Sequence, residues 1–227
     1  MYTNLKNNID FFIRNLLKIS RKNFQETSAE LIERNKLENK YTSDILEQYF
    51  KKRNINHTRI LDIGSKNWFY AKGEHAFFQS FCNDFILDGI ELDAYRLYSN
   101  LYNRLETARY HTKGLKNTNY ITGNLLDIKD KYDYIIWFLP FVTAEPLRYW
   151  GLPMRYFCPE KLLKHAYNLL NNNGQLLIIN QTKEEAKVQK QLLQNLNIKF
   201  TELGEVKSVH LKYKYERFGF LIDKILT

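Results

Sequence analysis

The sequence predicts an α/β fold in which a doubly wound sheet of seven strands ends in an antiparallel C-terminal hairpin. Short apolar runs alternate with amphipathic helical segments along most of the chain, and polar residues follow several of the runs. The last two runs, 200–209 and 218–225, alternate well enough to pair as a hairpin. A chain of 227 residues suits one large core better than two small ones. We therefore expect one domain over 58–227, preceded by a helical extension or cap over 1–57.

Composition restricts the environment and the partners of the chain. The formal net charge of +9 suits an anionic partner, but basic and acidic residues are intermixed, which favours a solvated surface over a nucleic-acid footprint. Cys82 and Cys158 are too few for a disulfide framework or a metal cluster and fit a reducing compartment. The apolar stretch Phe11–Ile19 contains Arg14 and Lys18, so it resembles neither a membrane span nor a signal sequence. We expect a cytoplasmic protein without a metal site.

The extension over 1–57 is predicted to be helical. Its apolar stripe consists of Ile9, Phe12, Ile13, Leu16 and Leu17. We expect this face to pack on the domain or on a second subunit in a homodimer, and a peripheral membrane contact is the alternative. A second helix is expected to begin near Thr42 or Ser43, with Asp44 in its first turn.

The segment Arg59–Tyr70 organises the rest of the chain. A buried strand reaches Asp62 and stops at Gly64, where a tight turn lets the backbone approach a ligand. A helix follows, and its buried side is expected to come from Ala76, Phe77 and Phe81. The loop between such a strand and helix is where open α/β sheets bind nucleotides.

The second strand, Phe85–Leu92, ends in acidic residues. Glu91 closes the strand and Asp93 lies just beyond it. A carboxylate at this position of a βαβ unit accepts hydrogen bonds from the hydroxyls of a bound ribose. Together with the turn at Gly64, it favours a nucleoside site at this edge of the sheet.

The remaining segments complete the alternation. The predicted elements are a helix over Tyr95–Leu115, strands over Tyr120–Thr122 and Tyr132–Phe141, a loop over Val142–Pro159, a helix from Pro159, a strand over Gln175–Asn180 and a helix over Glu184–Leu196.

The loop Val142–Pro159 is unusually aromatic for a connection. It holds Tyr149 and Trp150 beside Arg155, which suggests the wall of a substrate site. Packing of these rings onto the sheet is the alternative. We name Tyr149, Trp150, Arg155 and, at a strand end, Asn180 as candidate substrate residues.

Four segments together resemble the class I S-adenosylmethionine-dependent methyltransferases, over Thr58 to the C-terminus. They are ILDIG at 60–64, GIELD at 89–93, ITGNLLD at 121–127, and the run from YDYIIWFL to HAYNLLNNNGQLLIIN at 132–180. The resemblance implies a Rossmann-like fold, S-adenosylmethionine as cofactor and methyl transfer as the activity.

The resemblance also implies cofactor residues. Asp62 and Gly64 would border the methionine end of the cofactor, Glu91 would bind the ribose, and Asn124 or Asp127 would face the adenine. Ser65, Leu92 and Phe138 complete the implied cofactor set. The family usually has Asp at the position of Asn124.

The chain departs from the family in the turn after the first strand. The family pattern is DxGxGxG, whereas this chain has Lys66 and Trp68 in place of the second and third glycines. Asn67 tolerates left-handed geometry and could preserve the backbone path. Lys66 either points away, holds an acidic ligand group or weakens cofactor binding, and we expect it to point away because its side chain is flexible and strongly hydrated.

The sequence names no catalytic residue. The Asn/Asp-Pro-Pro-aromatic motif of the amino-methylating enzymes is replaced by FLPF at 138–141. Glu145, His165, Asn180 and Gln181 are candidate bases by position alone. A small-molecule acceptor is expected over nucleic acid. A catalytically silent binding protein, an RNA-modifying enzyme and, against the missing GxGxxG, a nicotinamide enzyme are the alternatives.

Overall fold

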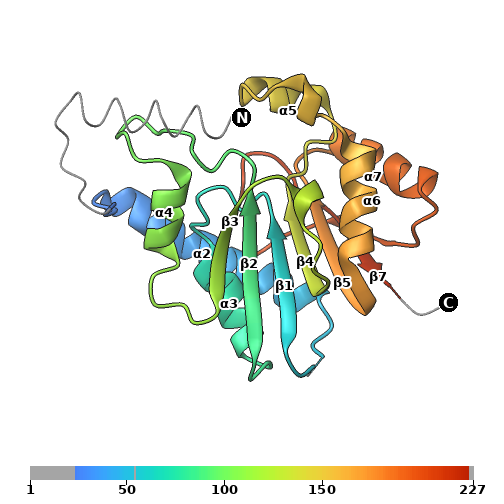
Figure 1. The fold of residues 1–227 in the computed structure, drawn as a ribbon, viewed down its shortest axis with the longest axis horizontal. Helices are drawn as coiled ribbons and strands as arrows, with labels where there is room; N and C mark the ends of the chain where they lie inside the picture. The colour runs from blue at the N-terminus through green and yellow to red at the C-terminus, as the bar shows by residue number, and fades with distance from the viewer. Residues whose placement is uncertain (1–23, 54, 225–227) are drawn as a thin grey trace.

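A seven-stranded sheet runs through the centre of the protein (Figure 1), of which the computed structural model describes residues 24–53 and 55–224. Its strands are β1 Thr58–Ile63, β2 Phe85–Glu91, β3 Thr118–Thr122, β4 Tyr132–Phe138, β5 Leu170–Asn180, β6 Thr201–Glu205 and β7 Phe218–Asp223. The order is β3-β2-β1-β4-β5-β7-β6. Strands β1 to β5 are parallel, and β7 is antiparallel to both β5 and β6. This topology confirms the predicted doubly wound sheet and its hairpin.

Helices cover both faces of the sheet. They are α2 Ala29–Tyr49, α3 Ala71–Gln79, α4 Arg104–His111, α5 Ala144–Tyr149, α6 Pro159–Leu169 and α7 Lys183–Asn195, with the 3₁₀ turns η1 Leu125–Asp127 and η2 Met154–Tyr156.

Two apolar cores lie on opposite faces of the sheet because side chains alternate along each strand. Ile60 of β1 belongs to the core beneath α2 and α3, and the next residue, Leu61, belongs to the core beneath α6 and α7. The central strands β1, β4 and β5 are buried on both sides, which explains why they appear in the sequence as continuous apolar runs.

Helix α2 begins earlier than the sequence indicated, so the prediction of a start near Thr42 or Ser43 is wrong. The helix begins at Ala29, where the side chain of Ser28 caps it by accepting from the Leu31 N–H at 3.4 Å. Thr42 and Asp44 lie inside the helix because the preceding segment, rich in Glu, Leu and Lys, favours helix and continues into them without a break.

The predicted helix over Tyr95–Leu115 is much shorter, because α4 begins only at Arg104. Asn103 and Glu106 form a reciprocal capping box that fixes the start, and the backbone before it is turned and bridged between Leu97 and Asn103. The helix therefore begins at the capping box, although the residues before it also have a helical pattern.

Smaller corrections concern α3 and the segment after β4. The buried side of α3 includes Phe77 and Phe78, whereas Ala76 is exposed and Phe81 lies beyond the helix. Strand β4 ends at Phe138, before Pro140, and the predicted loop Val142–Pro159 contains α5 and η2.

The predicted apolar stripe Ile9–Leu17 lies outside the described residues. Within the described part of the chain, no helix is long and apolar enough to cross a membrane.

Candidate functional site

The turn after β1 takes an unusual backbone path. Gly64, Lys66 and Trp68 have positive φ angles of 76°, 60° and 48°. These are the three glycine positions of the DxGxGxG pattern, so the path suited to glycine persists although two of the glycines are replaced. Asn67 does not adopt left-handed geometry, contrary to the expectation that it would rescue the turn. Each non-glycine residue held there costs on the order of 1 kcal/mol, which other contacts must offset.

Contacts with β2 and α3 hold this turn. The N–H groups of Gly64 and Ser65 donate to the carbonyl of Ile90 at 2.9 and 3.1 Å. The indole of Trp68 is fully buried, donates from Nε1 to Glu74 at 2.8 Å and covers Gly89, where an added Cβ would meet the ring at 2.8 Å. Trp68 thus fills a place that glycine at residue 89 leaves open, and this packing fixes the turn.

Two carboxyl groups are buried behind the turn. Asp62 Oδ2 accepts from the hydroxyl of Tyr70 at 2.9 Å, and Asp62 Oδ1 and Glu74 Oε1 have no partner among the described residues. Burial raises the pKa of Asp62 to about 8 and raises the pKa of Glu74 well above its usual value. Asp62 is therefore mostly protonated at neutral pH, which avoids an isolated buried charge.

Glu91 ends β2 with its carboxylate bound from three sides. Oε2 accepts from the Lys66 N–H at 2.9 Å, and Oε1 accepts from the Asp93 N–H at 2.7 Å and from Arg104 Nη1 at 2.9 Å. The side chains of Glu91 and Arg104 are 9% and 6% exposed, so this is a buried ion pair. Glu91 is thereby fixed as a charged acceptor at the strand end.

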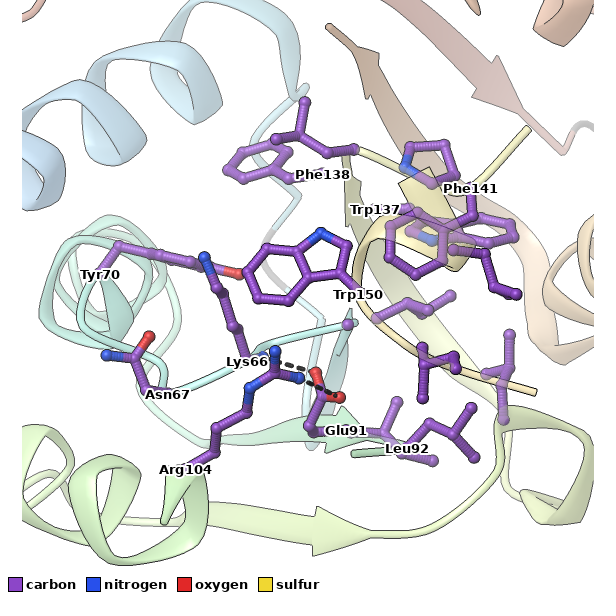
Figure 2. A pocket seen from close by; sticks show the side chains of 18 of the residues that line it. Lys66, Asn67, Tyr70, Glu91, Leu92, Arg104, Trp137, Phe138, Phe141 and Trp150 are labelled. Carbon is purple, nitrogen blue, oxygen red and sulfur yellow. Dashed lines mark hydrogen bonds and ion pairs between the residues drawn. The ribbon is translucent and has the colours of Figure 1, made fainter. Parts of the chain in front are cut away.

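A cavity of about 970 Å³ opens above the carboxyl ends of β1, β2 and β4. Figure 2 shows Lys66, Glu91, Arg104 and Trp150 converging on it. The cavity is also lined by residues of α2, the segment 138–163 and the 213–217 segment before β7. Seven of the predicted site residues line it: Gly64, Glu91, Leu92, Asn124, Phe138, Trp150 and Arg155.

The other five predicted residues lie outside the lining. Asp62, Ser65 and Asn180 are fully buried, and the side-chain amide of Asn180 has no partner among the described residues. The side chain of Asp127 is exposed, and Tyr149 is 88% exposed. Two neighbours in the sequence, Tyr149 and Trp150, therefore face solvent and cavity respectively.

Trp150 is surrounded by cations that the sequence did not link to it. Its ring lies 4.7 Å from Lys66 Nζ, 5.1 Å from the guanidinium of Arg104 and 5.6 Å from that of Arg96. Arg96 also donates to the Trp150 carbonyl. Such contacts over an aromatic face are each worth about 0.5–1 kcal/mol at exposed sites and more when desolvated.

Lys66 does not point away, so that expectation is wrong. Its side chain lies in the cavity, with its ammonium over the Trp150 ring. Sequence reasoning also missed Tyr70 and Arg104, both of which line the cavity. The sequence signal for Lys66 was the break in the glycine pattern. Tyr70 and Arg104 carried no such signal, because their contacts with Asp62 and Glu91 join separate elements of the fold.

His165 has a structural hydrogen bond. Its Nε2 lies 3.1 Å from the carbonyl of Ile128, on the η1 side of α6. Neither His165 nor Glu145 lines the cavity. None of the positional candidates for a general base therefore lines the cavity.

Comparisons with known proteins identify the fold. No model of a known family matches the sequence, and no curated protein matches it significantly. Among solved structures, a SAM-dependent methyltransferase from Aquifex aeolicus matches with a TM-score of 0.60 at 16% identity, over 88% of this chain and 100% of that one.

Two further structures agree with this match. A methyltransferase from Pyrococcus furiosus gives a TM-score of 0.56 at 15% identity, over 97% and 98% of the two chains. Magnesium protoporphyrin IX methyltransferase from Synechocystis PCC 6803, with bound SAM, gives 0.53 at 10% identity over 94% and 96%. This chain therefore has the fold of the S-adenosylmethionine-dependent methyltransferases.

Proposed function

We propose that this protein transfers a methyl group from S-adenosylmethionine to a small-molecule acceptor. The observation that carries the proposal is the cavity at the ends of β1 and β2, where the open face of Gly64 and the charged Glu91 share one wall. A Cβ added to Gly64 would meet nothing within 4 Å, so space for a ligand is present against the backbone. This edge of a doubly wound sheet is where such folds bind nucleosides.

The residues present fit the adenosine part of the cofactor. Among the described residues, Glu91 Oε2 accepts one hydrogen bond, from the Lys66 N–H, and a carboxylate oxygen can accept two. One ribose hydroxyl can therefore bind without displacing Arg104. Ile90, Leu92 and Leu125 provide an apolar surface beside this acceptor, which suits the flat adenine ring.

Bound cofactor supplies a methyl group already attached to a sulfonium leaving group. The protein then has to hold the acceptor in line with that methyl and keep water out. We assign orientation of the ribose to Glu91 and the exclusion of water to the Trp150 ring, which covers this end of the cavity. Asn124 lines the cavity while its Oδ1 accepts from the Leu126 N–H at 3.0 Å. We assign its remaining amide group to the adenine.

A small-molecule acceptor is supported by the size and enclosure of the cavity. Its volume of about 970 Å³ lies at the upper end of the range for small-molecule sites, so it has room for a cofactor and a modest acceptor. Trp150 and Arg155 also line the cavity, and the Trp150 ring lies beside Lys66, where it can border both the cofactor and the acceptor. We assign the acceptor to this part of the cavity.

We also propose that the extension over 1–57 acts as a cap. Leu31, Arg34 and Glu38 of α2 line the cavity, and α2 packs on α3 through Asn39, whose side chain accepts from Gly73 and donates to Phe69. Deleting residues 1–40 should reduce turnover more than cofactor affinity, because Gly64 and Glu91 remain. A truncated protein that stays monodisperse and fully active would contradict the cap.

A catalytically silent binding protein is the second candidate, and Lys66 favours it because a cation near the cofactor site opposes a sulfonium. Isothermal titration with S-adenosylmethionine and S-adenosylhomocysteine tests the proposal. We expect saturable binding of both by the intact protein and none by Gly64→Val, whose β-branched side chain strains the turn and fills the ligand space. Absence of saturable binding by the unaltered protein rejects a methyltransferase function.

A further inference from the structure

The ammonium group of Lys66 has no anionic partner among the described residues. Its Nζ lies 4.7 Å from the centre of the Trp150 ring. The nearby carboxylates already have partners: Glu91 is paired with Arg104 and Asp93 with Arg96. Glu38, which also lines the cavity, is paired with Arg34 and accepts from the hydroxyl of Tyr213. Figure 2 shows the Lys66 side chain rising from the turn into the cavity, beside this buried pair. The described residues that line the cavity thus include more cations than acids.

The environment of Lys66 disfavours its charge. Burial lowers the pKa of Lys66, and the guanidinium of Arg104 lowers it further. Lys66 is half-buried, and the three donors of its ammonium are open to a ligand in the cavity. An anion bound in the cavity would satisfy these donors and restore the balance of charge.

The backbone gives a second, independent reason. Lys66 is held at a φ of 60°, a conformation that glycine adopts without strain and lysine does not. The lysine N–H donates to Glu91, but glycine would provide the same N–H. Lysine differs from glycine at this position only by its side chain. We therefore expect the side chain to have a role that offsets the backbone strain.

We propose that Lys66 binds the carboxylate at the amino-acid end of the cofactor. This inference rests on the proposed function. The Lys66 backbone contacts Glu91, which we assign to the ribose, so its side chain belongs to the cofactor part of the cavity rather than to the acceptor part. A carboxylate carried by the cofactor also neutralises the lysine, which would otherwise repel the sulfonium of the same molecule.

Binding affinities test this assignment without any measurement of activity. Titration calorimetry would compare S-adenosylhomocysteine, its decarboxylated analogue, and 5′-methylthioadenosine, which lacks the whole amino-acid end. The variants are Lys66→Met, Lys66→Arg and Lys66→Gly. Lys72→Met serves as a matched control, because Lys72 is exposed on α3 and does not line the cavity.

We expect Lys66→Met to weaken S-adenosylhomocysteine binding by about 10- to 100-fold, the usual effect of one charge-assisted hydrogen bond. Binding of the two ligands without a carboxylate should change less than about twofold. Lys66→Arg should retain part of the discrimination, and Lys72→Met should retain all of it. Lys66→Gly should also lose affinity, even though it relieves the backbone and restores the glycine pattern.

The outcomes separate this inference from the proposed function. Equal weakening of all three ligands, unchanged affinity in Lys66→Met, or tighter S-adenosylmethionine binding in that variant would overturn the role of Lys66 alone. Unchanged cofactor affinity together with weaker binding of an anionic acceptor would assign Lys66 to the acceptor and overturn the inference. If the unaltered protein binds none of the ligands, the proposed function fails and Lys66 loses its assigned partner.

Discussion

Trp68 and Trp150 both lie close to Lys66, yet they are held in opposite ways. Trp68 is fully buried in the turn after β1, where it packs on Gly89 and donates to Glu74. Trp150, at the end of α5, is half-buried, and the side chains of Lys66, Arg96 and Arg104 lie against its ring.

Two walls of the cavity are therefore held by different kinds of interaction. Apolar packing against strands fixes the wall built around Trp68, because displacing that ring would open a void in the core. Cation–π contacts and a hydrogen bond from Arg96 hold the Trp150 wall, and water can replace much of their energy. The first wall is therefore suited to shaping the cofactor turn and the second to admitting and covering ligands.

Trp68→Ala should have the largest effect on stability. The change creates a void over Gly89 and leaves Glu74 without its donor, so we expect a loss of about 3–5 kcal/mol in the free energy of unfolding. Urea denaturation measures it. Trp68→Gly is the control for backbone strain and should unfold at a slightly higher urea concentration than Trp68→Ala, since glycine tolerates the positive φ at this position. A loss below about 1 kcal/mol in Trp68→Ala would remove the contrast with Trp150.

Glu91→Ala should destabilise the protein by about 3–5 kcal/mol, because it removes the closer carboxylate from the buried guanidinium of Arg104 and leaves Asp93 at 4.0 Å. The double variant Glu91→Ala, Arg104→Met should recover much of this loss in a thermal or urea melt. Cofactor affinity is better tested with Glu91→Gln, which keeps an acceptor, paired against the double variant. If Glu91→Ala and the double variant were equally stable, the ion pair would have no structural role.

Stability should fall as pH rises from about 4 to about 8. The pKa of Asp62 in the folded protein is raised to about 8, far above its usual value near 4 in an unfolded chain. Asp62 therefore keeps a proton in the folded state that it loses in the unfolded state across this interval, so through Asp62 each rise in pH favours unfolding. Burial lowers the pKa of His111 to about 4, which opposes this slope below about pH 6.5. Asp62→Asn should flatten the dependence of the urea midpoint on pH, apart from a remaining slope from Glu74. An unchanged slope would show that Asp62 is ionised in the folded protein.

Trp150→Ala should have the smallest effect on stability, about 1–2 kcal/mol, since it removes cation–π contacts but leaves no cavity in a packed core. Methyl transfer should nevertheless be impaired, with near-normal cofactor affinity, if this ring borders the acceptor. Tyr149→Ala is the matched control, because Tyr149 is the adjacent ring and is 88% exposed. A normal rate in Trp150→Ala would remove this ring from the acceptor site, and a large loss of stability would place it in the core with Trp68.

The sequence alone determined the order of the strands along the chain and most of the helices between them, although not α5. Apolar runs such as 132–138 and 176–179 are strands because they are buried on both faces, and that burial is visible as composition. Gly64 and Glu91 could also be identified, since each lies at a strand end and parallel strands bring their carboxyl ends to one edge. These features are local in sequence, or follow from topology.

Only the tertiary structure decided which side chains face the cavity. Nothing near Lys66 in the sequence shows that the ring of Trp150, 84 residues later, lies over its ammonium. Nor does the sequence show that Arg104 donates to Oε1 of Glu91. Likewise, Tyr149 and Trp150 are adjacent aromatic residues, and only the path of α5 turns one outward and the other inward. Local sequence sets propensity and periodicity, whereas the partner of a polar or aromatic side chain depends on contacts between distant segments, which exist only once the sheet has assembled.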